Sequence, residues 1–293
     1  MVREAVDIDF VKMTGAGNDF VLINNQTLGL QLDWQAVARS LCHRRYGIGA
    51  DGLLVLEKSR KADFLMRYYN ADGTDGGMCG NGGRCSALYA MQQINVSRIT
   101  FEALGFIYSA SAAENSVVKL SMKDPSAIQT NMSVPLQDSF LILHFIDSGA
   151  PHAVIFMDEL AEKYCNAIAR DGIWQLGKTI RHHPKFSPQG TNVDFVSLGE
   201  HGEVSIRTYE RGVENETLAC GTGCVATAVI MSLLRDIGPP LRVRTLSGEC
   251  LAVSFSKKGE KISEVILEGP AVTVFTGRFR WMPAEELVKE KVI

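Results

Sequence analysis

Two cysteines in this chain are each followed by the pattern Gly-x-Gly, and they stand about half a chain apart. The stretches are Cys79-Gly80-Asn81-Gly82 and Cys220-Gly221-Thr222-Gly223 in a chain of 293 residues. A thiol group transfers protons in both directions, because it is a base when ionised and an acid when protonated. The repeated motif therefore predicts an internal duplication in which each half supplies one reactive thiol to a single substrate.

Each cysteine also precedes a segment with helical character. The second motif is followed by apolar residues spaced as on one buried helix face: Ala226, Val229, Ile230 and Leu233. The first motif leads into the helix-compatible run 87–91. The N-terminus of a helix has free N–H groups and the positive end of the helix dipole, so it favours negative charge. We therefore expect both thiols to have a lowered pKa, and the glycines to let an anion approach the backbone.

The other five cysteines carry no comparable signal. Cys42, Cys85, Cys165 and Cys250 are interpreted as buried or inert thiols, which pack like small apolar residues. Cys224 lies one helical turn after Cys220, where helix packing explains it better than a metal pair, because no cluster of Cys or His completes a ligand set. The sequence predicts no metal site.

The elements around the two motifs follow the same order, which is strands, one helix and further strands. In the first half, strand-like runs cover 10–13, 20–23, 53–56, 64–69, 99–101, 107–108 and 117–122. In the second half they cover 140–146, 153–156, 193–196, 204–209, 241–245, 251–255, 265–267 and 272–275. Other helices are expected over 34–41, with Asp33 as N-cap, and near 159–170, and a polar surface loop is expected over 178–189.

This order predicts an α/β (α+β) fold of two pseudo-symmetric domains, each a curved mixed sheet wrapped around one central helix. The segment 123–125, Lys-Asp-Pro, is a suitable joint between them. The N-terminal half, with Cys79, is expected to comprise 1–124 plus 277–293. The C-terminal half, with Cys220, is expected to comprise 125–276.

The composition is that of an ordinary globular protein, with 46% hydrophobic and 22% charged residues. A net charge of −3 disfavours nucleic acid and membrane as main partners. Seven cysteines, an odd number, and the lack of an apolar signal segment at 1–7 argue against a secreted disulfide scaffold. We therefore expect a cytoplasmic location, and no run reaches membrane-spanning length.

With these motifs in place, the sequence resembles the diaminopimelate epimerase family, the pyridoxal-phosphate-independent amino-acid isomerases of lysine biosynthesis. The resemblance covers nearly the whole chain and rests on segments in the family's order: 12–20, 70–73, 78–82, 190–193, 209–212 and 219–223. It implies an active site in the cleft between the two domains and epimerisation of LL-2,6-diaminopimelate to the meso isomer, for lysine and cell-wall precursors. It also implies that the enzyme needs no cofactor and is a homodimer.

The resemblance further implies a role for individual residues. Cys79 and Cys220 match the two acid/base residues on opposite faces of the substrate α-carbon, and His152 and Glu210 match residues that support catalysis. The positions that line the carboxylate site at the two helix starts are Gly80, Asn81, Gly221 and Thr222. The positions that hold the ammonium and carboxylate groups of the substrate are Asn18, Asn70, Asn192, Glu210 and Arg211.

The sequence departs from the family pattern at two positions. Family members often have Gln where Gly52 stands and Asn where Ala150 stands, and both amides help to bind substrate. Neither Gly nor Ala has a side chain that forms hydrogen bonds, so these two contacts are not expected here. The other motif residues are present, and the departures are interpreted as local variation within an active enzyme.

Three other classes of protein compete with this interpretation. Proline racemase-like enzymes share the paired motif but typically have His where Asn81 stands, and they have no use for the pair Glu210-Arg211. A phenazine-type isomerase would lack both Cys79 and Cys220. A redox-sensing or metal-binding protein uses exposed thiols but does not need the asparagines, and a zinc assay distinguishes it.

Overall fold

The computed structural model describes residues 5–136, 139–199 and 202–282. The chain divides into two compact units, Met1–Leu120 with Pro270–Ile293 and Ser121–Gly269. The sequence placed these joints after residues 124 and 276. The second of those positions falls inside strand β17, Val272–Trp281, which pairs with the first strand of the chain.

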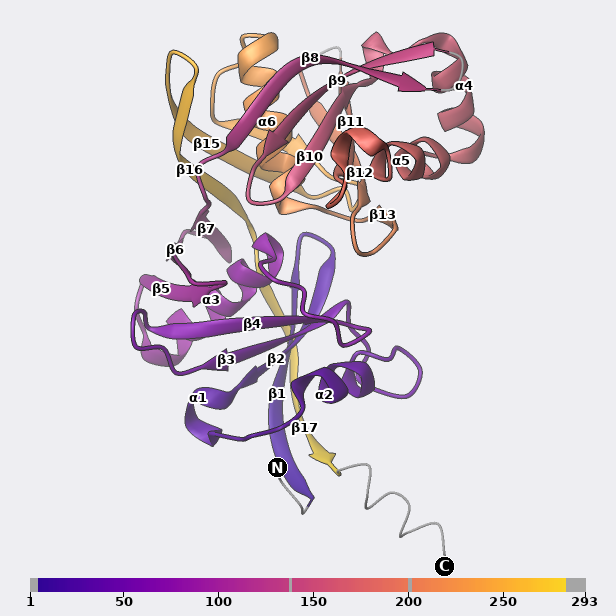
Figure 1. The fold of residues 1–293 in the computed structure, drawn as a ribbon. Helices are drawn as coiled ribbons and strands as arrows, with labels where there is room; N and C mark the ends of the chain where they lie inside the picture. Colours follow the sequence, from indigo (N-terminus) through magenta and orange to yellow (C-terminus); the bar gives the residue numbers. More distant parts are fainter. Residues whose placement is uncertain (1–4, 137–138, 200–201, 283–293) are drawn as a thin grey trace, which may run out of the picture. The chain divides into compact units, whose positions relative to one another are not determined.

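The first unit is one mixed sheet with helices on both faces (Figure 1). Its strands follow the order β17-β1-β2-β3-β4-β5-β6-β7. The bounds are β1 Val6–Gly15, β2 Asn18–Asn24, β3 Gly52–Glu57, β4 Phe64–Asn70, β5 Arg98–Ala103, β6 Phe106–Ala112 and β7 Val117–Ser121. The helices are α1 Asn25–Leu28, α2 Trp34–Leu41 and α3 Gly80–Ile94. Alternate residues of β2 and β3 pack against α2, and the residues between them face α3.

The second unit repeats this arrangement, with its strands in the order β8-β9-β10-β11-β12-β14-β15-β16. The bounds are β8 Ser126–Leu136, β9 Ser139–Asp147, β10 Pro151–Phe156, β11 Asn192–Leu198, β12 Val204–Glu210, β14 Leu241–Arg244, β15 Cys250–Lys258 and β16 Lys261–Pro270. A short strand, β13 Asn215–Thr217, also pairs with β12. The helices are α4 Glu162–Asp171, α5 Trp174–Arg181 and α6 Gly221–Leu234, with single 3-10 turns at Met157–Glu159 and Pro184–Phe186.

The two sheets have the same succession of strand directions. Read along each order, neighbouring strands pair antiparallel, antiparallel, parallel, antiparallel, parallel, antiparallel and antiparallel. The central helices also correspond, since α3 follows β4 and α6 follows the β12–β13 hairpin. The predicted fold class of two pseudo-symmetric domains, each with a sheet around a central helix, is confirmed.

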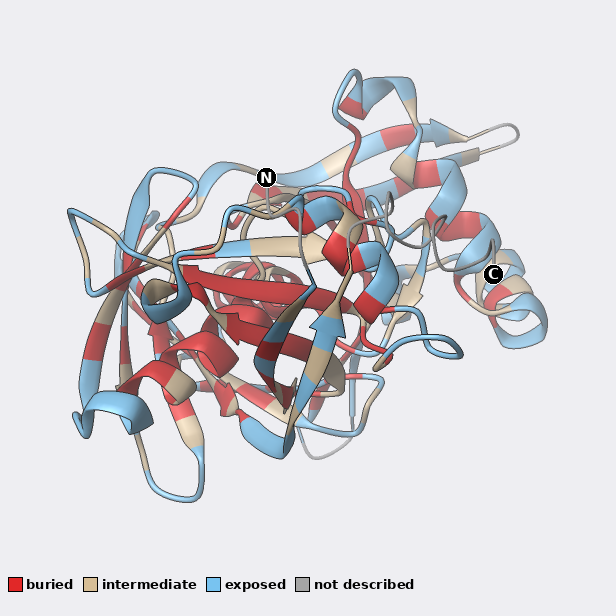
Figure 2. Ribbon diagram, turned by 90° about the horizontal axis from the view of Figure 1, so that it is seen from below, coloured by how far each residue is buried: buried red, intermediate tan, exposed pale blue. Residues whose placement is uncertain are grey.

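The central helices differ from the outer ones in burial. Helix α6 contacts six strands and is buried on every side along Gly221–Ser232, except at Thr222. Helix α3 is buried in the same way along Gly80–Leu88. Outer helices have one buried and one exposed face, and such helices are striped red and pale blue in Figure 2. The glycine-rich starts of α3 and α6 are therefore packed inside the units that they organise.

One predicted loop is wrong in part. The segment 178–189 was expected to be a polar surface loop, but its first four residues belong to α5. Leu176, Gly177 and Ile180 of this helix are buried in the core on the face of the sheet opposite α6. The apolar face of α5 begins before residue 178, so the polar composition of the later residues concealed it.

Candidate active site

Cys79 is the N-cap residue of α3 and is half-buried. Its sulfur accepts a hydrogen bond from the N–H of Gly82 at 3.4 Å. A Cβ atom at Gly82 would lie 2.9 Å from Cδ2 of Leu54, so a larger residue here would displace the Leu54 side chain of strand β3. The remaining N–H groups of this turn belong to Gly80 and Asn81, the residues expected to bind a carboxylate.

Asn18 and Asn81 are held together beside this cysteine. The Asn81 amide donates to Oδ1 of Asn18 at 2.6 Å, and Arg84 Nη2 donates to Oδ1 of Asn81 at 2.8 Å. Both Asn81 and Arg84 are buried. Because the two asparagines bond each other, their orientation is fixed before any substrate binds. The structure thus brings together three of the predicted site residues, Cys79, Asn18 and Asn81.

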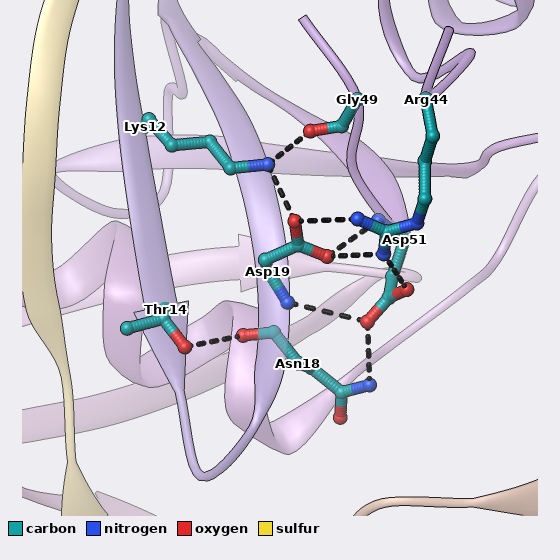
Figure 3. A network of polar contacts seen from close by, with 7 residues as sticks. All are labelled: Lys12, Thr14, Asn18, Asp19, Arg44, Gly49 and Asp51. Atoms are coloured by element: carbon teal, nitrogen blue, oxygen red, sulfur yellow. Dashed lines mark hydrogen bonds and ion pairs between the residues drawn. The ribbon is translucent and has the colours of Figure 1, made fainter.

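An ion-pair network holds Asn18 from the other side (Figure 3). Asn18 donates to Oδ2 of Asp51 at 3.0 Å, and Arg44 bridges Asp51 and Asp19 through bonds of 2.7 and 2.8 Å. Lys12 donates to Asp19 at 2.6 Å. Burial acts to raise the pKa of Asp19, but the bonds from Arg44 and Lys12 outweigh it and lower that pKa to about 2. Asp19 therefore stays ionised and keeps the network closed.

Asn70 lies at the same ends of the strands of the first sheet as Asn18. Phe20 pairs with Gly52, and Gly52 pairs with Asn70, so the start of β2 and the end of β4 meet there. Asn70 is half-buried, and its amide donates to Oγ1 of Thr74 at 3.0 Å. Asn70 projects from the same face of the sheet as Phe20 and Gly52, because the three residues are paired across neighbouring strands.

Cys220 is the N-cap residue of α6 and is 8% exposed. Its sulfur lies 3.4 Å from Oγ1 of Thr222. Burial raises its pKa well above the usual value, and the carboxylates of Glu210 and Asp194 raise it further. Bonds from Thr222 and the N–H of Gly223 act in the opposite direction but do not compensate. The expected lowered pKa is therefore wrong for Cys220, because desolvation outweighs the helix N-terminus.

Thr222 connects this thiol to a fully buried histidine. His152 Nε2 lies 2.8 Å from Oγ1 of Thr222, and its Nδ1 lies 2.7 Å from Oδ2 of Asp194. The other oxygen of Asp194 accepts a bond from Thr208 at 2.8 Å. An ionised carboxylate only accepts hydrogen bonds, so Nδ1 of His152 carries a proton. In the neutral ring, Nε2 then accepts the Thr222 hydroxyl, which leaves the Thr222 oxygen to accept from the Cys220 thiol.

Asn192, Glu210 and Arg211 complete the predicted set. The Asn192 amide lies 3.4 Å from Nε2 of His152, and its oxygen accepts the backbone N–H of Arg211 at 2.8 Å. Glu210 ends strand β12 and accepts a bond from Thr217 at 2.8 Å. These bonds join Asn192 and Arg211 to His152 and its partners Asp194 and Thr222. Glu210 lies at the strand end beside them.

The sequence did not single out Asp194, Asp51 or Tyr68. Asp194 is the one acidic residue in an apolar run at 193–196, and that contrast was a usable signal. Asp51 precedes an apolar strand as a turn residue, where acidic side chains are common, and gave no such signal. Tyr68 looked like one of several aromatic residues of a strand, yet its ring lies where a side chain at Gly52 would stand.

Two features are absent from the part of the chain that the structure describes. Within 5–136, 139–199 and 202–282, no group of three or more His, Cys, Asp and Glu residues is arranged to hold a metal ion. No helix in the described part of the chain has the length and apolarity needed to cross a membrane. The expected lack of a cofactor, the cytoplasmic location and the homodimer stay predictions.

Solved structures share this fold over almost the whole chain. A phenazine biosynthesis protein of the PhzF family from Bacillus anthracis has a TM-score of 0.68 at 16% identity, covering 95% of this chain and 100% of that one. A hydroxyproline epimerase from Agrobacterium vitis, with bound trans-4-hydroxy-L-proline, has a TM-score of 0.68 at 13% identity, covering 95% and 94%. The fold therefore belongs to the class that includes these PhzF and epimerase proteins.

Sequence relatives narrow this class to one family. A family model described as diaminopimelate epimerase matches residues 10–126 and 144–274. The diaminopimelate epimerase of Chlorobaculum tepidum is 42% identical over 270 residues, which cover 90% of this chain and 98% of the relative. That of Methanothrix thermoacetophila is 38% identical over 283 residues, covering 92% and 95%. The chain belongs to the diaminopimelate epimerase family and is an isomerase, as the sequence motifs predicted.

Proposed function

We propose that the protein converts LL-2,6-diaminopimelate to meso-diaminopimelate with two thiols that act from opposite faces of one α-carbon. The observation that carries this proposal is that each unit holds a cysteine at the same place, directly before a buried central helix. One cysteine, as thiolate, removes the α-proton. The other, as thiol, donates its proton to the opposite face, so the configuration inverts and the two cysteines exchange charge states.

The first turns of α3 and α6 are proposed to stabilise the reacting carboxylate. Negative charge moves into this group as the α-proton leaves, because the α-carbon becomes an anion conjugated with it. The N–H groups of Gly80, Asn81, Gly221 and Thr222 lie in the first turns of α3 and α6, at the positive ends of the two helix dipoles. Donors fixed before the reaction stabilise developing charge without reorganisation.

Cys220 is proposed to lose its proton through Thr222 to His152. The thiol proton passes to the Thr222 oxygen while the Thr222 hydroxyl proton passes to Nε2 of His152. The products are a thiolate and an imidazolium whose Nδ1–H bonds Asp194. This route supports ionisation of a thiol whose pKa is raised by burial. The distances of 3.4 and 2.8 Å along it are those of hydrogen-bonded neighbours.

The remaining polar residues are proposed to hold the other groups of the substrate. Asn18, Asn70 and Asn192 offer amide groups, and Glu210 and Arg211 offer one charge of each sign. A substrate end with one ammonium and one carboxylate group matches such a pair. The backbone of Arg211 is already fixed by its bond to Asn192, so its position does not have to be created on binding.

Proton NMR in D2O tests the proposed reaction. Purified enzyme is expected to incorporate deuterium at the α-carbon of LL-diaminopimelate while the meso isomer forms, without added cofactor. L-Proline and L-alanine serve as control substrates and are expected to show no exchange. Exchange of proline as fast as diaminopimelate would contradict the proposal, as would the absence of any exchange with diaminopimelate. The product is proposed to feed lysine and cell-wall precursor synthesis.

A further inference from the structure

The residues that face the central helix differ in polarity between the two sheets. The two sheets have the same succession of strands. When their registers are aligned, five positions of the second unit are equivalent to five positions of the first. In the second unit these residues are His152, Asn192, Asp194, Thr208 and Glu210. In the first unit they are Phe20, Gly52, Leu54, Tyr68 and Asn70. A polar cluster in one unit therefore corresponds to a largely apolar one in the other.

The two glycines at the start of the helices support this correspondence. A Cβ atom at Gly223 would lie 2.8 Å from Oδ1 of Asp194 and 3.3 Å from Oγ1 of Thr208. A Cβ atom at Gly82 would lie 2.9 Å from Cδ2 of Leu54. Each glycine is the third residue after its cysteine. Leu54 thus stands where Asp194 stands, and Tyr68 is the counterpart of Thr208.

Tyr68 is held between two glycines. A Cβ atom at Gly52 would overlap Cε2 of its ring and the backbone oxygen of Tyr69, and one at Gly76 would overlap Cδ1 and Cε1 on the other edge of the ring. The Tyr68 ring also meets Phe20 edge-on, with centroids 5.9 Å apart and planes at 79°. The N–H of Gly76 donates to the carbonyl of Tyr68 at 2.9 Å, which anchors the loop to the strand. Tyr68, Gly52 and Gly76 therefore form one closely packed set.

This set borders the residues proposed to bind substrate. Tyr68 and Asn70 project from the same face of β4, two residues apart. The Cβ position of Gly76 is 3.1 Å from Oδ1 of Asn70, so the loop that covers the ring also touches that amide. Tyr68 is half-buried, so part of this residue is accessible.

We propose that Tyr68 is a specificity-determining residue, whose ring provides an apolar wall for the methylene chain of diaminopimelate and occupies the space of a side chain at position 52. This inference rests on the proposed function. The aromatic ring gives this position an apolar surface, and Gly52 and Gly76 are the residues that make room for it.

A double-mutant cycle tests the proposal through KM, kcat and thermal stability. Tyr68→Ala is expected to raise KM for diaminopimelate at least tenfold and to change kcat less than threefold, whereas Tyr68→Phe keeps the ring and leaves KM within threefold. Gly52→Gln is expected to lower the Tm and raise KM, because the new side chain overlaps both the ring and the backbone carbonyl of Tyr69. The double variant Gly52→Gln/Tyr68→Ala is expected to lose less Tm than the two single variants added together, because only the overlap with the ring is removed.

Gly238→Gln is the matched control, because a Cβ atom at Gly238 meets no atom within 4 Å. Its Tm and KM are expected to stay at the wild-type values. An unchanged KM in Tyr68→Ala, or fully additive Tm losses in the double variant, would overturn the proposal. Wild-type enzyme that leaves diaminopimelate unchanged would instead refute the proposed function, and the Tm values would still report whether ring and glycine compete for space.

Discussion

Replacement of Asp194 by asparagine tests the proton route through His152. The carboxylate of Asp194 is fully buried and receives two hydrogen bonds, from His152 at 2.7 Å and from Thr208 at 2.8 Å. An asparagine keeps the shape and one oxygen acceptor but removes the negative charge beside the imidazolium. General acid–base catalysis contributes about 10²–10⁴-fold. We therefore expect kcat to fall at least about 100-fold, which is about 2.7 kcal/mol of transition-state stabilisation.

The same substitution is expected to make the Cys220 thiol more reactive, although it slows turnover. The charge of Asp194 helps to raise the pKa of this thiol, so removing it lowers that pKa. Iodoacetamide at a fixed pH should then label Cys220 faster in Asp194→Asn than in the wild type, although turnover is slower. A lowered pKa moves the pH profile of labelling to lower pH, whereas greater exposure of the thiol raises the labelling rate at every pH. We expect a cost of about 1–3 kcal/mol in unfolding free energy, as for a buried hydrogen bond that is weakened.

The assay is α-deuterium exchange followed by NMR, with Tm measured on the same samples. Asp158→Asn is the matched control, because Asp158 is exposed and pairs with Arg235 at 2.9 Å on the surface. Such a pair contributes about 0–1 kcal/mol, so activity and Tm should stay close to the wild type. A folded Asp194→Asn enzyme that retains more than a tenth of kcat would refute the proton route.

Three further outcomes are expected. Cys79→Ala and Cys220→Ala should each lower epimerisation at least about 100-fold at unchanged Tm, because one face of the carbon then lacks its acid or base; near-normal turnover by either variant contradicts the two-thiol mechanism. Arg211→Ala should raise KM for diaminopimelate at least about tenfold, since removing one partner of a charge pair that the bound substrate desolvates costs about 2–5 kcal/mol; an unchanged KM would exclude its contact with substrate. Asp19→Asn should lose about 2 kcal/mol of unfolding free energy at pH 7, because the pKa of Asp19 is lowered from 3.8 to about 2 on folding. Because that pKa is depressed, the difference in unfolding free energy between wild type and variant should be complete above about pH 5 and disappear as pH falls toward 2. Urea unfolding at pH 7 and pH 3 measures this difference, and a value independent of pH would count against the role of Asp19.

The fold was predictable because its main signals are local. Cysteine, glycine and an apolar helical pattern follow one another directly in both halves, and the strand patterns recur in the same order around them. β8 was missed, because most of its side chains are exposed and its sequence shows no regular alternation.

The chemistry of the site was less predictable, because it depends on tertiary burial. The residue types at the two helix starts predicted ionisable thiols at both places. Only the packing shows that Cys220 is 8% exposed and near two carboxylates, which reverses the expected direction of its pKa. The partnership of Asp194 with His152 joins residues 42 positions apart through neighbouring parallel strands, and no sequence spacing reveals it.

The return of β17 to β1 has a consequence for synthesis of the chain on the ribosome. Val6 pairs with Trp281 and Phe10 with Gly277, so an edge strand of the first sheet comes from the end of the described chain. The second unit, by contrast, is one continuous segment, Ser121–Gly269. Contacts between residues close in sequence form soonest, and domains generally fold as units during synthesis. The unit encoded later is therefore expected to be complete first, while the unit encoded earlier waits for its last strand.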